Sequence, residues 1–186
     1  MMRTRVFRAS MTLDVPRADV FAFFSEAANL GRLTPPEMGF RIVTPAPILM
    51  RPGTLIDYTL NLHGVPLRWR SEITQWEPPS EFVDVQLRGP YAQWVHIHRF
   101  REQGGMTIIE DEVRYALPFG MLGRIAHPLV RRRLTRIFEY RRAALERILL
   151  GNAAYGEVRH SIRGRSRAPR QGRSGRARRG GPRPAA

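Results

Sequence analysis

The sequence of 186 residues contains no cysteine and no lysine, so all 31 of its basic residues are arginine. The absence of cysteine excludes disulfide bonds, thiolate metal sites and cysteine nucleophiles. Long apolar runs are also missing, since no stretch approaches the roughly 20 apolar residues that a membrane-spanning helix needs. The N-terminus, MMRTRVFRASMTLDVPRADVF, breaks every apolar run with Arg, Asp or Pro and therefore lacks the core of a signal peptide. We expect a soluble, cytoplasmic protein.

Positive charge is concentrated near the C-terminal end. The formal net charge is +15, and residues 151–186 hold ten arginines against one acid, Glu157. Because this segment is rich in Gly and Pro and poor in apolar residues, it cannot bury enough surface to offset the entropy of ordering. We predict one domain over residues 1–150 and a disordered tail over residues 151–186. Two roles of the tail stay open: a solvated segment that reflects a general preference for arginine, or a contact with nucleic acid or another anionic surface.

The first part of the domain combines a strand with short helices. Residues 6–15 have the alternation of a strand. After Pro16, a favourable residue for a helix start, Val20, Phe21 and Phe24 recur at helical spacing. We therefore expect one or two short helices after the first strand.

The remainder of the domain is predicted to be a run of strands followed by one long helix. Gly, Pro or Asn separates several of the strands, as turns require. The predicted strands cover residues 39–45, 54–63, 65–77, 81–88, 93–103 and 106–117. Residues 121–150 have an amphipathic helical pattern, and Pro128 is expected to mark the start of the main helical segment.

Turn residues predict the register of two hairpins. A turn over residues 63–66 makes one face of the first hairpin apolar and the other polar, as in a half-buried sheet. Its inward pairs are Leu62 with Leu67, Leu60 with Trp69, Tyr58 with Ser71 and Ile56 with Ile73.

The second hairpin turns at Gly104 and Gly105, which adopt positive φ readily. Its predicted inward pairs are Trp94 with Tyr115, His96 with Val113, His98 with Asp111 and Phe100 with Ile109. This register places two imidazoles and one carboxylate on a sheet face that is otherwise apolar.

A carboxylate on an apolar face loses its hydration at a cost of several kcal/mol unless it is paired. We therefore expect Asp111 to pair with His98, which raises the proton affinity of the histidine and lowers that of the acid. Three roles of the group stay open: a structural pair, an anchor for a polar group of a ligand, or part of a metal site. No metal is predicted, because neither His63 nor His127 is placed to complete such a site.

The order of one strand, short helices, six strands and a long C-terminal helix resembles the SRPBCC superfamily, the START and Bet v 1-like helix-grip proteins. The stretches that carry the resemblance are residues 20–43, 69–100 and 107–125. They are most similar to the ligand-binding branch related to polyketide cyclase and dehydratase-like proteins. The resemblance implies an α+β helix-grip domain, in which a curved antiparallel sheet of about seven strands wraps around the C-terminal helix.

The resemblance also implies a cavity between sheet and helix that holds a lipid, polyketide-like or aromatic molecule, with no cofactor. No catalytic motif of the family maps onto this sequence, so we expect binding rather than catalysis. A cyclase or dehydratase-type enzyme that uses His98 and Asp111 is the alternative. The residues expected to contact the ligand are Tyr58, Trp69, Trp94, His96, His98, Phe100, Asp111, Tyr115 and Phe138.

Overall fold

The computed structural model describes residues 4–62, 64–118 and 120–151. The predicted disorder of the tail and its two possible roles concern residues that lie, apart from Gly151, outside this range. Within the described residues, no helix is both long enough and apolar enough to cross a membrane.

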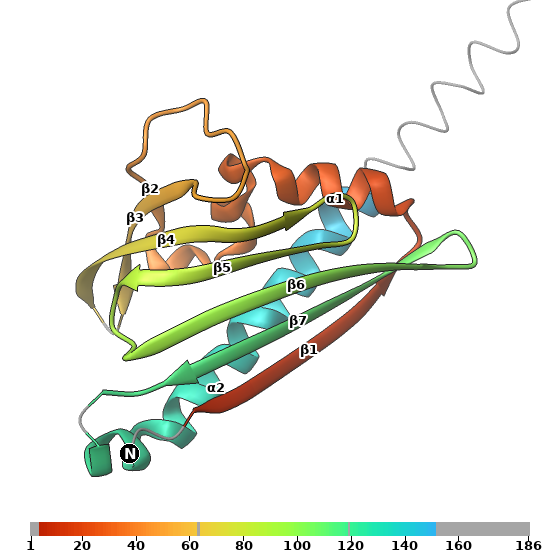
Figure 1. The fold of residues 1–186 in the computed structure, drawn as a ribbon. Helices are drawn as coiled ribbons and strands as arrows, with labels where there is room; N and C mark the ends of the chain where they lie inside the picture. Colours follow the sequence, from red (N-terminus) through yellow and green to blue (C-terminus); the bar gives the residue numbers. More distant parts are fainter. Residues whose placement is uncertain (1–3, 63, 119, 152–186) are drawn as a thin grey trace, which may run out of the picture. The chain divides into compact units, whose positions relative to one another are not determined.

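A seven-stranded antiparallel sheet forms the centre of the fold, and the long helix α2 runs diagonally behind the strands in Figure 1. The strands are β1 (Arg5–Leu13), β2 (Arg41–Ile42), β3 (Leu55–Leu62), β4 (Val65–Glu77), β5 (Glu81–Arg88), β6 (Gln93–Gln103) and β7 (Met106–Ala116). Their order across the sheet is β1-β7-β6-β5-β4-β3-β2.

The helices lie at the two ends of this strand sequence. Helix α1 (Arg17–Ser25) and two short 3₁₀ helices, η1 (Ala27–Leu33) and η2 (Pro36–Met38), follow β1. Helix α2 (Gly120–Leu145) continues into a π-helical turn, η3 (Glu146–Leu150). This arrangement is the helix-grip fold that the sequence predicts.

Apolar contacts hold α2 against the sheet, as its amphipathic pattern predicts. Leu134 and Phe138 are buried with Val113 and Tyr115 of β7. Farther along the helix, Leu145 is buried in a second cluster, which also contains residues of α1, β6 and β7. The two clusters secure α2 at two levels along the sheet.

The helical pattern predicted from residue 121 is confirmed, since α2 begins at Gly120, but the expected boundary at Pro128 is wrong. The helix is continuous from Gly120, and Pro128 lies inside it. Proline removes one backbone hydrogen bond of a helix, but the bonds on either side can remain. A proline therefore does not fix a helix boundary unless the residues before it also fail to form a helix.

The second strand is much shorter than its predicted range of 39–45. Gly39, two residues before the strand, has a φ of 52° and ends the preceding 3₁₀ helix η2. Pro45, beyond its other end, has no N–H to donate to a sheet ladder. Only the two residues of β2 pair with β3 as a result.

The first predicted hairpin register is wrong by two residues. Leu62 pairs with Val65, so the connection between β3 and β4 is two residues long rather than four. Gly64, with a φ of 79°, allows such a short turn. Because a slip of two residues keeps the alternation of a strand, the predicted inward face is unchanged, and Leu60 and Trp69 are buried.

The second predicted hairpin is confirmed pair by pair. Gly104 and Gly105 have φ values of 60° and 81° at the turn between β6 and β7. The observed partners are Trp94 with Tyr115, His96 with Val113, His98 with Asp111 and Phe100 with Ile109.

Irregular pairing between β4 and β5 contributes to the curvature of the sheet. The register shifts between Arg70 and Ser71 and again between Ile73 and Gln75. Extra residues in one strand of a ladder bend that strand and increase its twist. This bend belongs to the two strands that line much of the cavity described next.

Candidate functional site

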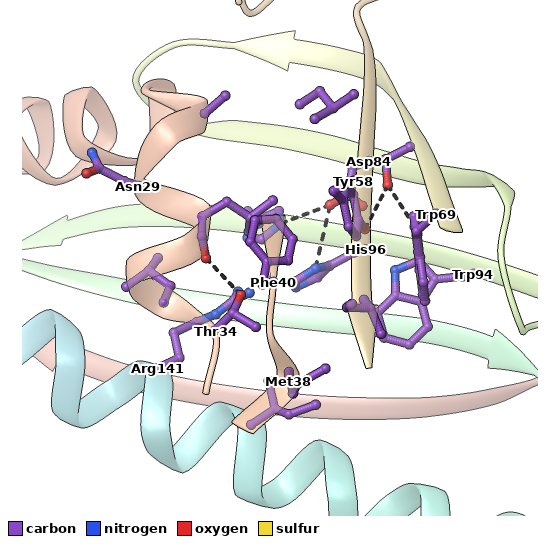
Figure 2. A pocket seen from close by; sticks show the side chains of 18 of the residues that line it. Asn29, Thr34, Met38, Phe40, Tyr58, Trp69, Asp84, Trp94, His96 and Arg141 are labelled. Carbon is purple, nitrogen blue, oxygen red and sulfur yellow. Dashed lines mark hydrogen bonds and ion pairs between the residues drawn. The ribbon is translucent and has the colours of Figure 1, made fainter. Parts of the chain in front are cut away.

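A cavity of about 180 Å³ lies between the inward face of β3–β6, helix α2 and the short helices that follow β1 (Figure 2). Most of its wall is aromatic or aliphatic, with Phe40, Leu60, Trp69 and Leu134 among the lining residues. Four ionisable side chains of the wall belong to one group: Asp84, His96, His98 and Arg141. The cavity therefore has a mainly hydrophobic lining, with these four ionisable side chains clustered in one part of its wall.

Three neighbouring strands and α2 bring these groups together. His96 and His98 alternate on β6 and therefore share a face of the sheet. The strand register places Asp84 of β5 opposite His96, and Asp111 of β7 opposite His98. Arg141 approaches from α2. We call Asp84, His96, His98, Asp111 and Arg141 the buried ionic cluster.

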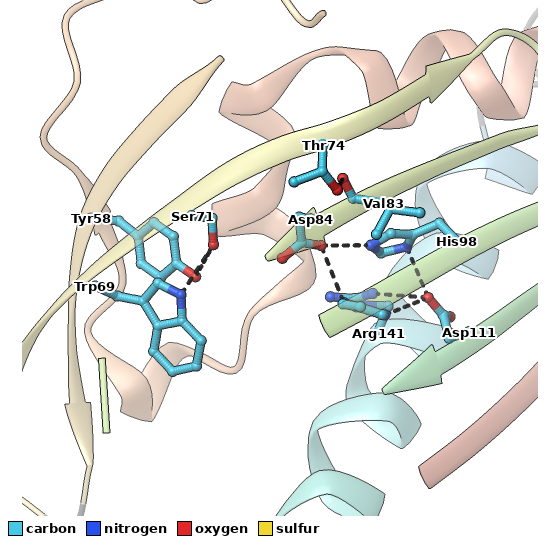
Figure 3. Close-up of polar contacts among 10 residues, drawn as sticks. Tyr58, Trp69, Ser71, Thr74, Val83, Asp84, His98, Asp111 and Arg141 are labelled. Atoms are coloured by element: carbon cyan, nitrogen blue, oxygen red, sulfur yellow. Dashed lines mark hydrogen bonds and ion pairs between the residues drawn. The ribbon is translucent and has the colours of Figure 1, made fainter. Parts of the chain in front are cut away.

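Each imidazole of the cluster lies between the same two carboxylates. His96 Nε2 is hydrogen-bonded to Asp111 Oδ1 at 2.9 Å, and His96 Nδ1 lies 3.6 Å from Asp84 Oδ2. His98 Nε2 is hydrogen-bonded to Asp84 Oδ2 at 3.2 Å (Figure 3). His98 Nδ1 lies 2.9 Å from Asp111 Oδ1, but out of line for a hydrogen bond, so this is an ionic contact.

Close packing restrains the two imidazoles further. Their ring centroids are 3.7 Å apart, with the planes tilted by 40°. His98 also stacks on Phe82, with centroids 4.1 Å apart and an angle of 18° between the planes. Packing on one side and carboxylates on both edges leave the rings little freedom to turn.

Arg141 supplies a positive charge beneath the cluster. Its side chain is 10% exposed, and Nη1 lies 3.5 Å from Asp111 Oδ1. The guanidinium also lies over the ring of Phe138, 4.9 Å from its centroid. Within the described residues, Arg141 Nε has no hydrogen-bond partner. Arg141 thus makes one long contact with Asp111 through Nη1, while the Nε–H group of its guanidinium has no acceptor among the described residues.

The surroundings separate the pKa values of the two histidines. Burial, together with the charge of His98, lowers the pKa of His96 to about 4. Burial acts in the same direction on His98, but its contacts with Asp111 and Asp84 outweigh it and raise the pKa of His98 above its ordinary value. His98 therefore holds a proton more tightly than His96, which is neutral near pH 7.

Both carboxylates of the cluster are ionised. Burial alone would raise the pKa of Asp84 and Asp111. Hydrogen bonds and charges from the histidines, with the charge of Arg141, outweigh burial and hold the pKa of each carboxyl below its usual range. The two negative charges are balanced when His98 is protonated, since Arg141 supplies the second positive charge.

A second polar group on the cavity wall is uncharged. Ser71 Oγ accepts a hydrogen bond from Trp69 Nε1 at 3.1 Å and lies 3.4 Å from the hydroxyl of Tyr58 (Figure 3). Burial raises the pKa of Tyr58, so its phenol stays protonated. These residues offer hydroxyl groups to the cavity rather than charges.

The structure places six of the nine predicted site residues in the cavity wall: Tyr58, Trp69, Trp94, His96, His98 and Phe138. Asp111 contacts both imidazoles but is not among the lining residues. Phe100 and Tyr115 are each 1% exposed and pack in the two apolar clusters that hold α2.

Asp84 and Arg141 were not predicted as site residues from the sequence. The alternation in EFVDVQLR offered a signal for Asp84, since it shares a strand face with Phe82. Arg141 follows Leu134 and Phe138 at helical spacing and is thus an arginine on the apolar side of α2. A charged residue on a buried face needs a partner, and both residues could have been selected on that ground.

Solved structures with similar folds have low sequence identity to this chain. Protein TTHA0849 from Thermus thermophilus gives a TM-score of 0.65 at 17% identity, over 80% of this chain and 99% of its own. Major latex-like protein 151 from Panax ginseng gives a TM-score of 0.57 at 9% identity, over 79% of this chain and 98% of its own. Norcoclaurine synthase from Thalictrum flavum, solved with dopamine and hydroxybenzaldehyde, gives a TM-score of 0.58 at 14% identity. The match covers 78% of this chain and 88% of the synthase chain.

These likenesses confirm the Bet v 1-like helix-grip fold that the sequence resemblance implies. No protein-family model matches the sequence, and no curated protein is significantly similar to it.

Proposed function

From the helix-grip fold shared with these structures, we propose that the protein binds a hydrophobic small molecule in the cavity between the sheet and α2. The observation that carries the proposal is the wall itself, which is mainly apolar and includes four side chains of the buried ionic cluster, Asp84, His96, His98 and Arg141. Ligand pockets commonly combine an apolar lining with a few polar groups that orient the ligand.

The size of the cavity favours an aromatic ligand over a long-chain lipid. Its volume of about 180 Å³ is similar to that of an engineered apolar cavity of about 150 Å³ that admits benzene. One substituted ring therefore fits without rearrangement of the wall. Dopamine and hydroxybenzaldehyde, the molecules bound by norcoclaurine synthase, are of this size class. A polar substituent on the ring would face the buried ionic cluster.

Binding of hydroxybenzaldehyde and 1-naphthol to the full-length protein, measured by calorimetry, tests this proposal. Leu62→Trp narrows the cavity and should weaken binding at least about tenfold, a loss of ~1.4 kcal/mol. Leu87→Trp is the matched control, because Leu87 is 53% exposed and lies outside the cavity wall. Equal affinity of the two variants, or no uptake of either probe by the unmodified protein, would refute the proposal.

A cyclase or dehydratase-type enzyme is the second candidate, and the state of His96 favours it. A neutral imidazole on a cavity wall can accept a proton from a bound molecule. Loss of water from an aromatic β-hydroxy ketone is a direct assay for such an activity. We expect His96→Gln to abolish turnover while 1-naphthol still binds. Unchanged turnover in that variant would remove His96 from the role.

A further inference from the structure

We propose that Asp84, His96 and His98 form a binding site for a divalent transition-metal ion on the cavity wall. One ligand atom from each residue can be chosen so that all three lie within 4.8 Å of one another. Two imidazoles and one carboxylate are ligands that Zn²⁺, Fe²⁺ and Co²⁺ accept. From the sequence, His96, His98 and Asp111 were possible metal ligands, but no metal was predicted because neither His63 nor His127 was placed to complete the site, and Asp84 was not identified.

The distances in the cluster suit a small ion. Ligand atoms of a tetrahedral zinc site lie roughly 3.3 Å apart, given metal–ligand bonds of about 2.0–2.1 Å. Asp84 Oδ2 lies 3.2 Å from His98 Nε2 and 3.6 Å from His96 Nδ1. These two distances are close to that spacing, and the ligand atoms of all three residues lie within 4.8 Å of one another.

Asp111 provides the second layer that such sites require. A metal-binding histidine commonly donates its other ring N–H to a carboxylate, which fixes the tautomer and the orientation of the ring. Asp111 Oδ1 lies 2.9 Å from His96 Nε2 and 2.9 Å from His98 Nδ1, the nitrogens that face away from Asp84. Asp111 therefore orients His96 through a hydrogen bond and holds His98 through an ionic contact.

The charge of the cluster also favours a cation. With both imidazoles neutral, two carboxylates face one guanidinium, that of Arg141, and one negative charge is left uncompensated. A proton on His98 can balance this charge, so a metal-free hydrogen-bonded cluster is the competing explanation. The two explanations differ in whether the protein takes up a stoichiometric metal ion.

Three protein ligands leave further coordination positions for other molecules. Asp84, His96 and His98 all line the cavity. An open position of the metal would therefore face the space in which a ligand is proposed to bind. Open positions distinguish catalytic and ligand-binding metal sites from closed structural ones. Metal uptake itself does not depend on the proposed binding of a small molecule.

The experiment uses the full-length chain without an affinity tag, freed of metal by a chelator. Titration with Zn²⁺ is followed by calorimetry, and titration with Co²⁺ by visible absorption. We expect one equivalent to bind, with Co²⁺ bands typical of four or five ligands. Asp111→Asn should weaken binding about 10- to 100-fold, as loss of a supporting carboxylate does elsewhere. Asp84→Asn and His96→Gln, which remove ligands, should weaken it further.

Two variants control for two of the three histidines outside the site. His127→Gln removes an imidazole that stacks on Tyr115, with ring centroids 6.1 Å apart. His160→Gln removes the histidine of residues 151–186. Neither change should alter the stoichiometry or the affinity. Thermal unfolding shows whether each variant is folded, and the two independent ligand removals keep the test decisive if one variant is not.

Three results would overturn the metal site. They are the absence of stoichiometric uptake, unchanged affinity in folded Asp84→Asn and His96→Gln variants, and loss of uptake in either control. Binding of 1-naphthol to the metal-free protein reports on the proposed cavity function separately. Failure of one proposal can therefore be told from failure of the other.

Discussion

Asp111 is the residue on which the buried ionic cluster depends most. Its Oδ1 lies within 2.9 Å of both imidazoles and 3.5 Å from the guanidinium of Arg141. Removal of this charge leaves Arg141 without its acidic partner, and it leaves His98 with only one of its two acidic partners, Asp84. We expect Asp111→Asn to lower the free energy of unfolding by about 2–3 kcal/mol, because it leaves buried charges uncompensated. Urea unfolding followed by circular dichroism measures this loss.

An exposed ion pair supplies the control for that measurement. Asp57 receives two hydrogen bonds of 2.8 Å from Arg70, yet the side chains of both residues are more than a third exposed. Water and salt screen such pairs. Asp57→Asn should therefore cost clearly less than Asp111→Asn. Similar losses in the two variants would show that burial does not set the strength of the cluster.

A single tyrosine of the cavity wall gives a prediction at alkaline pH. Burial, with a smaller contribution from Tyr115, raises the pKa of Tyr91 to about 12. The unfolded chain releases this proton near pH 10, whereas the folded chain retains it. Unfolding is therefore increasingly favoured as the pH rises above 10.

We expect Tyr91→Phe to reduce this alkaline loss by about 1 kcal/mol at pH 11, one pH unit above the unfolded pKa. Urea unfolding of both proteins at pH 8 and pH 11 measures the difference. If the pKa of Tyr91 is not raised in the folded protein, the free energies of unfolding of the two proteins should differ by the same amount at pH 8 and at pH 11. That result would contradict the prediction.

Only part of the cluster could be predicted from the sequence. His96, His98 and Asp111 lie in two consecutive strands, and a two-glycine turn fixes their register. Asp84 reaches them across a longer connection, and Arg141 comes from an element that follows all the strands. His98 also has a second acidic partner that was not predicted: its hydrogen bond goes to Asp84, while its contact with Asp111 is ionic. Contacts between distant elements have no local signal that sets their distance.

At the level of elements, the β6–β7 hairpin holds the histidines in register. Its turn contains Gly105, whose φ is 81° and whose Cβ position meets no atom within 4 Å. Alanine would thus incur only the cost of a left-handed conformation, about 1 kcal/mol. We expect Gly105→Ala to lower the free energy of unfolding by that amount, as measured by urea unfolding.

Gly151 allows a matched comparison. It also has open space around its Cβ position, but its φ is −61°, a helical value that alanine adopts easily. Gly151→Ala should leave stability unchanged or increase it slightly. If both substitutions have the same effect, the conformation of the turn is not what Gly105 contributes.

The elements themselves show where a sequence pattern is sufficient. Alternation fixed the inward face of β3 and β4 even though the predicted register was two residues out, because such a slip preserves the face. Turn length was the weaker signal, since Gly64 permits a tighter connection than the four-residue turn predicted. The boundary predicted at Pro128 failed for a related reason. The proline removes one backbone hydrogen bond, and the remaining hydrogen bonds and packing of α2 outweigh this local loss.

At the scale of the whole molecule, the cavity exists because the sheet bends while α2 stays packed at two levels. Leu134 and Phe138 secure one level, and Leu145 secures the other. Between β3, β4 and the helix, side chains such as Leu60 and Ile137 contact one another around the cavity rather than filling it. Because α2 packs against the sheet at two levels, the space between them can remain an apolar cavity, which is the physical basis of the proposed binding.

All four apolar clusters of the described residues lie between Phe7 and Leu149. Removal of residues 152–186 takes away ten arginines and Glu157, which lowers the formal net charge from +15 to +6. Because the clusters stay intact, we expect the shortened chain to unfold in urea with a free energy within about 1 kcal/mol of the full-length value. A larger loss, or a transition that is no longer cooperative, would show that these residues contribute to the fold and would contradict the division predicted at residue 150.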